Sequence, residues 1–459
     1  MTGITSLHGE RGIIMNLRHI ASRAGGVRNA IVWLMIIVIM PTLFFGLLQI
    51  KYHGVYSPID EGSHISYAWS VSHGRIPAKG DTVEQPILDD WACSGQSNVE
   101  LPSCGNATDP STFPSRGQQY NYIHPPLYYA VTGSAARVIA HFNHSMTFAQ
   151  AARLIQIPWM VVGLAFAYFA FRSWGLLRLY AYSAVVVIPF VPVFLNVGSA
   201  VTNDAPALAC GAILLWCAAR AFRRHRYDWV PAAMALLFCM MKGTFAFGFL
   251  GLAAVMFAVS IMRWYIGDVR LGCKGIASSC ATVLASLLCV FGWSKFQNMR
   301  GMTNWQNPLN ATKTEGNPIR QWMGTALSGL DLGHAIGYRD MSDRPVFMLW
   351  IALITVVLVG ATGFLYFQHD AISSHLMLIA TTVFSMLLYP TMVQLREYLN
   401  SGLTFGSLTI RYGMCLVPLA LCCWALALQH RRSRIIAVFV PMFGICCGFV
   451  SVLTTATLV

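Results

Sequence analysis

The chain has 459 residues, of which 56% are hydrophobic and only 11% are charged. Soluble globular domains carry about 25% charged residues, so this composition excludes a soluble protein and indicates a chain that crosses a membrane many times. The formal net charge of +13 does not indicate nucleic-acid binding, because the basic residues form short clusters between apolar stretches rather than one patch.

The N-terminal segment 1–29 is basic and polar, and we expect it to be cytoplasmic. No cleavage site of the Ala-x-Ala type follows the first apolar stretch, which predicts a retained membrane helix rather than a cleaved signal peptide. Translation can start at Met1 or at Met15, and the sequence does not distinguish these alternatives.

Apolar stretches divide the rest of the chain, because a helix needs about 20 apolar residues to cross a bilayer. Residues 30–459 are therefore expected to form one all-α membrane domain of about 11 transmembrane helices. The expected spans are 30–50, 151–171, 179–196, 205–222, 229–241, 244–262, 275–293, 346–367, 373–392, 409–428 and 435–457. The sequence "MKGTF" interrupts the fifth and sixth of these, so they are expected to form a hairpin or a broken helix.

Lys and Arg clusters predict the orientation, because cytoplasmic loops carry an excess of both residues. These clusters fall on alternate connections, which leaves two long loops, 51–150 and 294–345, on the extracytoplasmic side. Residues 124–142 are apolar but interrupted by Gly and Ser. We expect them to form a helix in the headgroup region, because a twelfth span there would invert every later basic cluster.

Cysteines do not indicate a metal site, because no two CxxC pairs occur and most cysteines lie in apolar stretches. Cys93 and Cys104 differ, since both lie in the polar first loop. They can form a disulfide if that side is oxidising, but spacing alone does not fix the geometry, and free thiols are the alternative.

The first outer loop begins with "YSPIDEGSHISYAWSVSHGRIP" (56–77), which is rich in titratable residues. If 59–70 is helical, Asp60, Glu61 and His64 share one face. Such a cluster suits a general base with an electrostatic partner, or the binding of a divalent metal such as Mg²⁺ or Mn²⁺. A capped helix at the membrane surface with solvated charges is the alternative.

Four further candidates lie on the same predicted side of the membrane. Asp204 precedes an apolar stretch, and it is expected to be either an acid of the site or a plain helix cap. Lys242 lies between two apolar stretches, where it can bind a lipid-linked phosphate or extend to the interface. Arg411 and Tyr412 begin a span, where Arg suits phosphate and both residue types also serve as interfacial anchors.

His124 in "YIHPPLYY" is another candidate site residue, with a helix cap as the alternative.

The charged residues of the second outer loop are expected to be solvated. No Walker loop, GxGxxG, HExxH or GxSxG motif occurs, so the sequence does not indicate cytosolic ATP-driven chemistry.

Four pieces of sequence occur together and in order: "PIDEGSHISYAWSVSHGRIP", "HPPLYY", "NDAPALACGAILL" and "RYGMCLVP". This arrangement resembles the GT-C superfamily of polytopic glycosyltransferases. It is especially similar to bacterial relatives of protein mannosyltransferases and aminoarabinose transferases whose first loop reads Pro-x-Asp-Glu-x-x-His. The resemblance covers most of the chain, from residue 30 to residue 430.

The resemblance implies a polyprenyl-phosphate sugar as donor and a glycan, glycolipid or protein as acceptor. It implies transfer on the extracytoplasmic face of a bacterial inner membrane, with the donor tail in a groove open to membrane lipids. The chain ends without a soluble domain, so acceptor recognition is expected from the outer loops or from a partner. Some GT-C members use a divalent metal and others do not, so no cofactor is assigned.

The family's motif residues carry over onto four positions. Asp60 matches the first-loop acid, which implies a general base or a group that orients the acceptor, and Glu61 lies beside it. His64 and Tyr67 match the end of the same motif. Lys242, like Arg411 at the start of a later span, has only positional similarity to the cations that bind the donor phosphate.

Two other classes of protein are the alternatives. A transporter or flippase for a lipid-linked or charged solute would place its charges mid-span and show an internal repeat, and no repeat is visible here. A non-catalytic scaffold would not need the charged candidates to meet, and a separation of more than about 20 Å would favour it.

Overall fold

The computed structural model describes residues 26–52, 54–96, 99–303, 305, 313–315, 317–328, 341, 343–368, 373–406, 408 and 410–455. Nearly all regular structure in these residues is helical, and one antiparallel pair of two-residue strands accompanies it. The prediction of an all-α membrane protein is therefore confirmed. Most of the predicted cytoplasmic segment, residues 1–25, lies outside the described residues.

The helices fall into an apolar bundle and a set of shorter elements. In chain order the α-helices are α2 (Met40–Tyr52), α3 (Glu61–Ser72), α4 (Gln85–Ser94), α5 (Leu127–Phe142), α6 (Phe148–Leu154), α7 (Gln156–Ser173), α8 (Arg178–Val187), α9 (Leu195–Ser199), α10 (Ala207–Phe222), α11 (Val230–Cys239), α12 (Ala246–Tyr265), α13 (Val269–Asn298), α14 (Pro318–Ser328), α16 (Pro345–Tyr366), α17 (Ser373–Ser401), α18 (Val417–His430) and α19 (Arg434–Thr454). A π-helix, η1 (Leu34–Ile39), precedes α2.

Short 3₁₀ turns and two strands complete the fold. The turns are η2 (Pro110–Thr112), η3 (Pro114–Gly117), η4 (Tyr120–Ile123), η5 (Ile188–Phe190), η6 (Pro192–Phe194), η7 (Gly243–Phe245) and η9 (Ile410–Leu416). The strands β1 (Lys313–Thr314) and β2 (Thr404–Phe405) pair in antiparallel register. These small elements connect the long helices at the end of the bundle where the candidate residues lie.

The described residues do not confirm the expected count of 11 membrane spans. In the described part of the chain, eight helical stretches are long and apolar enough to cross a membrane. They are Gly26–Tyr52, Phe148–Ser173, Gly243–Tyr265, Val269–Asn298, Pro345–Tyr366, Ser374–Leu399, Arg411–His430 and Arg434–Thr454. A ninth span results if Arg178–Phe190 and Pro192–Ser199, which meet at a 58° bend, are counted as one.

Three expected spans therefore appear in altered form. Prolines 189 and 192 interrupt the expected span 179–196, because proline lacks the N–H that continues a helix. The expected spans 205–222 and 229–241 are the shorter helices α10, with 16 residues, and α11, with 10 residues. Lys242 and η7 separate α11 from α12, as the interrupting "MKGTF" predicts.

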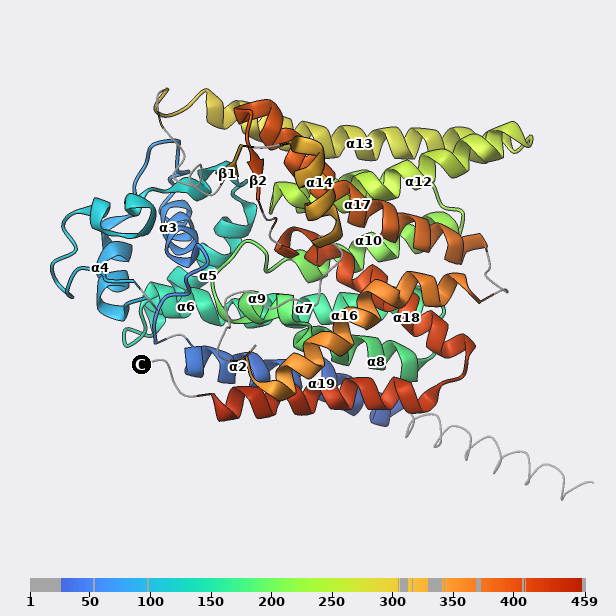
Figure 1. Ribbon diagram of the computed structural model, residues 1–459, viewed down its shortest axis with the longest axis horizontal. Helices are drawn as coiled ribbons and strands as arrows, with labels where there is room; N and C mark the ends of the chain where they lie inside the picture. Colours follow the sequence, from blue (N-terminus) through green and yellow to red (C-terminus); the bar gives the residue numbers. More distant parts are fainter. Residues whose placement is uncertain are drawn as a thin grey trace, which may run out of the picture.

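The long helices run side by side, and α3, α4, α5 and α6 gather at one end of the bundle (Figure 1). The strands β1 and β2 lie toward the same end. The connections from α12 to α13 and from α18 to α19, both basic in sequence, lie at the opposite end. This separation of polar loops from basic connections agrees with the alternation of Lys and Arg clusters along the chain.

Two glycines allow the close packing that assembles the polar end. A Cβ added at Gly133 of α5 would lie 2.2 Å from the carbonyl oxygen of Ala68 in α3. A Cβ added at Gly211 of α10 would lie 2.1 Å from the carbonyl oxygen of Cys415 in η9. Any larger residue would push these backbones apart, so glycine is needed at both positions.

The segment between α2 and α5 is cross-linked, because Cys93 and Cys104 form a disulfide. This confirms the pairing over the alternative of free thiols. The predicted interfacial helix 124–142 corresponds to α5, which packs against α3 and α6 and is not among the helices long enough to cross a membrane.

Candidate active site

Asp60 lies immediately before α3 in the left-handed backbone region, with φ 60° and ψ 6°. This region costs a residue other than glycine about 1 kcal/mol or more, although Asp tolerates it better than most. The side chain makes no capping hydrogen bond to α3. Strained backbone that does not serve a helix cap is typical of functional sites.

Two partners hold the Asp60 carboxylate. The Tyr120 hydroxyl donates to Oδ1 at 2.8 Å, and Nη2 of Arg411 donates to Oδ2 at 2.6 Å. Burial is the largest single influence and would raise the pKa of Asp60, but the charge of Arg411, the nearby His64 and the hydrogen bonds from Arg411 and Tyr120 together hold this pKa below its ordinary value. The carboxylate is therefore ionised at neutral pH, and 25% of the side chain stays exposed.

Arg411 continues this contact into a network of four charged side chains. Its Nη1 lies 3.9 Å from Oδ2 of Asp204. Asp204 in turn forms an ion pair with Nζ of Lys242 through Oδ1. The Lys242 ammonium also lies 5.3 Å from the ring centroid of Tyr412. We call Asp60, Arg411, Asp204 and Lys242 the ion-pair network.

The network joins residues that are far apart in sequence and mostly buried. Asp204 is 0% and Lys242 2% exposed, and Arg411 is 15% exposed. Helix α10 begins at Ala207 with Pro206 at its N-cap, so Asp204 is not the plain helix cap that the sequence left as an alternative. The charged candidates are therefore in direct contact, and the separation of more than about 20 Å that would favour a scaffold does not occur.

A cluster of aromatic rings adjoins the network. The rings of Tyr67 and Tyr129 stack with their centroids 3.8 Å apart, and the Tyr67 hydroxyl donates to the backbone carbonyl of His124 at 2.8 Å. Nδ1 of His64 lies 2.8 Å from the Tyr129 hydroxyl. Burial lowers the pKa of His64 to about 3, so its imidazole is neutral at physiological pH. This cluster combines flat apolar faces with uncharged hydrogen-bonding atoms.

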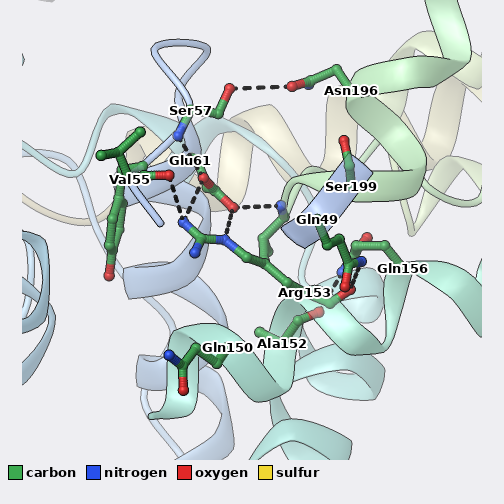
Figure 2. A network of polar contacts seen from close by, with 12 residues as sticks. Gln49, Val55, Ser57, Glu61, Gln150, Ala152, Arg153, Gln156, Asn196 and Ser199 are labelled. Carbon is green, nitrogen blue, oxygen red and sulfur yellow. Dashed lines mark hydrogen bonds and ion pairs between the residues drawn. The ribbon is translucent and has the colours of Figure 1, made fainter. Parts of the chain in front are cut away.

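Glu61 follows Asp60 in sequence but has different surroundings (Figure 2). Its carboxylate is fully buried and accepts hydrogen bonds from Nε and Nη2 of Arg153 at 2.8 and 3.0 Å. The backbone amides of Ser57 and Val201 also donate to it, at 2.7 and 3.0 Å. The pair of Glu61 and Arg153 therefore ties the start of α3 to α6 and to the segment before α10.

The predicted metal ligands Asp60, Glu61 and His64 do not fit a metal ion in this arrangement. Both oxygens of Glu61 accept hydrogen bonds, and Nδ1 of His64 contacts a tyrosine. Across the described ranges, no group of three His, Cys, Asp or Glu side chains is placed to hold a metal ion. The geometry supports no step through a metal at these three residues.

All nine predicted site residues lie in the described structure, but three important partners escaped the sequence analysis. Tyr129 is the last residue of the "HPPLYY" motif, and its place in that motif is a signal that points to it. Tyr120 and Arg153 carry no local signal, because their acidic partners lie 60 and 92 positions away.

Among solved structures, the chain is similar to the crystal structure of ArnT from Cupriavidus metallidurans bound to undecaprenyl phosphate. The two share 12% sequence identity with a TM-score of 0.46, over 90% of this chain and 62% of that one. The chain therefore spans less than two thirds of the length of that structure. The comparison with curated proteins gives no match.

Residues 124–289 match the model of the dolichyl-phosphate-mannose-protein mannosyltransferase family. The matched segment contains His124, Asp204 and Lys242, and it ends before Arg411. It also contains two of the four quoted motifs, "HPPLYY" and "NDAPALACGAILL". The match covers 166 of the 459 residues, so this segment of an all-α, polytopic membrane protein is similar to a family of mannosyltransferases.

Proposed function

We propose that the protein transfers a sugar from a polyprenyl-phosphate donor to a cell-surface glycan, glycolipid or protein acceptor. We place the reaction on the extracytoplasmic face of a bacterial inner membrane. The observation that carries this proposal is the ion-pair network, which brings two acids and two cations into direct contact. The name of the matched family refers to a dolichyl-phosphate sugar, which belongs to the same chemical class of donor.

Asp60 is suited to act as the general base. Its carboxylate is ionised and partly exposed, and an ionised carboxylate offers about four positions for hydrogen bonds. Tyr120 and Arg411 each donate to it, which leaves room for the hydroxyl of an acceptor. As the acceptor oxygen forms a bond to the anomeric carbon of the sugar, its proton passes to Asp60.

The cations of the network suit the leaving group. The bond between the anomeric carbon and the phosphate oxygen breaks, and its electron pair leaves with the polyprenyl phosphate. Positive charge held beside that oxygen stabilises the transition state more than the ground state. Arg411 binds phosphate well through its planar guanidinium, and Lys242 acts as a compact point charge.

The remaining candidate residues either bind the substrate or position the residues that do. We assign the half-buried His124 to the sugar, because a flat ring packs against the C–H face of a sugar and a neutral nitrogen binds its hydroxyls. His64 and Tyr67 are buried, so we assign them to the support of this ring, and the hydrogen bond from the Tyr67 hydroxyl to the His124 carbonyl is one such contact. Tyr412 packs beside the Lys242 ammonium. The predicted catalytic part of Glu61 stays a prediction, and its contacts with Arg153 favour a positioning role.

Transfer from defined donors tests this proposal. Purified protein is incubated with radiolabelled polyprenyl-phosphate sugars, a panel of hexoses and aminosugars, and native membranes as the source of acceptors. We expect label in the glycan, glycolipid or protein fraction and an equal release of polyprenyl phosphate. Movement of an intact donor across vesicles without cleavage would instead support the transporter alternative and contradict the proposal.

A further inference from the structure

The ion-pair network is electrically neutral. Asp60 and Asp204 contribute two negative charges, and Arg411 and Lys242 contribute two positive charges. A sugar linked through a phosphodiester carries a negative charge of its own, which the network as a whole does not balance. Because a charge taken out of water is costly unless it is paired, a further cation beside the network is expected to bind the donor.

Arg396 of α17 is a cation that has no acidic partner among the described residues. Its side chain is exposed, and no hydrogen bond or ion pair of its guanidinium occurs within the part of the chain that the structure describes. Helix α17 packs against η9, which holds Arg411 and Tyr412. Arg396 therefore belongs to an element that borders the site from the Arg411 side.

Arg300 is a second cation with unused hydrogen-bonding capacity. It follows α13, which packs against η4, the turn that holds Tyr120. Nη2 of Arg300 donates to the carbonyl of Ile76 at 2.9 Å, but Nη1 is buried without a hydrogen-bond partner among the described residues. An unpaired buried N–H is uncommon, and it indicates that an acceptor belongs there.

The electrostatic surroundings of His124 connect Arg396 with the network. Burial is the main cause that lowers the pKa of His124 well below its ordinary value. The positive charges of Lys242, Arg411 and Arg396 lower it further. Arg396 therefore acts on the same imidazole as both cations of the network.

We propose that Arg396, together with Arg300, binds the phosphate of the lipid-linked sugar donor before the reaction. Arg411 and Lys242 then keep their acidic partners until charge develops on the leaving group. This inference rests on the proposed function and adds two donor-recognition residues from outside the network. Because the contact already exists in the ground state, loss of Arg396 weakens donor binding more than it slows the chemical step.

Binding of two short probes isolates the contribution of the phosphate. Farnesyl phosphate and its uncharged counterpart farnesol are titrated against the purified full-length protein in detergent. We expect the wild type to prefer farnesyl phosphate. Arg396→Gln should weaken farnesyl phosphate binding about tenfold, since a hydrogen bond to a charged group is lost, and should leave farnesol binding unchanged.

Three further variants sharpen the experiment. Arg396→Lys keeps the charge and is expected to retain part of the preference, and Arg300→Gln should also weaken phosphate binding. Arg344→Gln is the matched control, because Arg344 is exposed at the start of α16 and its guanidinium contacts the Thr454 carbonyl at 3.3 Å. It should bind both probes as the wild type does, and unchanged farnesol binding shows that each variant is folded.

The outcomes separate this inference from the proposed function. If the wild type prefers farnesyl phosphate and both Arg396→Gln and Arg300→Gln keep the full preference, the inference is overturned and the proposed function stands. If the wild type does not distinguish farnesyl phosphate from farnesol, the polyprenyl-phosphate donor itself is contradicted, and the inference fails with it.

Discussion

Replacing Arg153 by Met tests whether the buried pair with Glu61 holds the frame of the candidate site. The side chains of Arg153 and Glu61 are 5% and 0% exposed. Met fills a similar volume but donates no hydrogen bond, so the Glu61 carboxylate would lose its charged partner while it stays buried (Figure 2). Helix α6 would then lose its side-chain attachment to the start of α3.

The expected cost follows from the burial of the pair. Removing one partner of a buried ion pair costs about 3 to 5 kcal/mol. An unfolding entropy of about 2 cal/mol/K per residue over 459 residues gives about 1 kcal/mol per degree. The unfolding temperature should therefore fall by about 3 °C or more. Helices that persist in detergent lower the entropy of unfolding, which makes the fall larger.

Thermal unfolding of the purified protein in detergent, followed by tryptophan fluorescence, measures this shift. The double variant Glu61→Gln with Arg153→Met removes the stranded charge, so it should recover part of the loss. Arg344→Met is the control at an exposed position, with an expected change within about 0.5 kcal/mol. If Arg153→Met lowers the unfolding temperature no more than this control, the structural role of the pair is refuted.

Three further predictions concern the disulfide, pH and metals. A thiol reagent added before reduction should not label Cys93 or Cys104, and labelling of both would contradict the disulfide. Replacing both residues by Ser should lower the free energy of unfolding by about 3 kcal/mol, as expected for a loop of this length. The pKa of His64 is about 3 in the folded protein and about 6.5 in the unfolded chain, so the unfolded chain binds the extra proton and stability falls as pH drops below about 6.5. His64→Asn should flatten the dependence of the unfolding temperature on pH between about 6.5 and 4.5, and an unchanged slope would count against this. Since Asp60, Glu61 and His64 do not form a ligand set, EDTA should leave the unfolding temperature unchanged, whereas a rise on addition of Mg²⁺ or Mn²⁺ that Asp60→Asn abolishes would contradict this.

The features that the sequence could predict are those that depend on neighbouring residues. Long apolar stretches mark most of the spans, because the thickness of the bilayer sets a required length. The Pro-x-Asp-Glu-x-x-His motif marks Asp60 as a candidate site residue. This motif is also a local signal, because its residues lie within one or two turns of a helix. The 58° bend after Phe190 was not predictable, because prolines mark where a helix breaks but not the angle between its parts.

The features that escaped prediction depend on packing between distant segments. Asp60 and Arg411 lie 351 positions apart, and their contact depends on how closely η9 lies against α10 at Gly211. The separate roles of neighbouring Asp60 and Glu61 have the same origin. Only the folded chain places Arg411 beside one carboxylate and Arg153 beside the other.

Sugar transfer by the Asp60→Asn variant tests the proposed reaction most directly. Asn keeps the size of the side chain and an oxygen for the Tyr120 hydroxyl, but it cannot take a proton from an acceptor. We expect the rate of transfer from a polyprenyl-phosphate sugar to fall at least about 100-fold at an unchanged amount of membrane-inserted protein. The matched variant Asp89→Asn, at an exposed carboxylate in the same outer loop, should transfer at the wild-type rate. Transfer by Asp60→Asn at the wild-type rate would contradict the account.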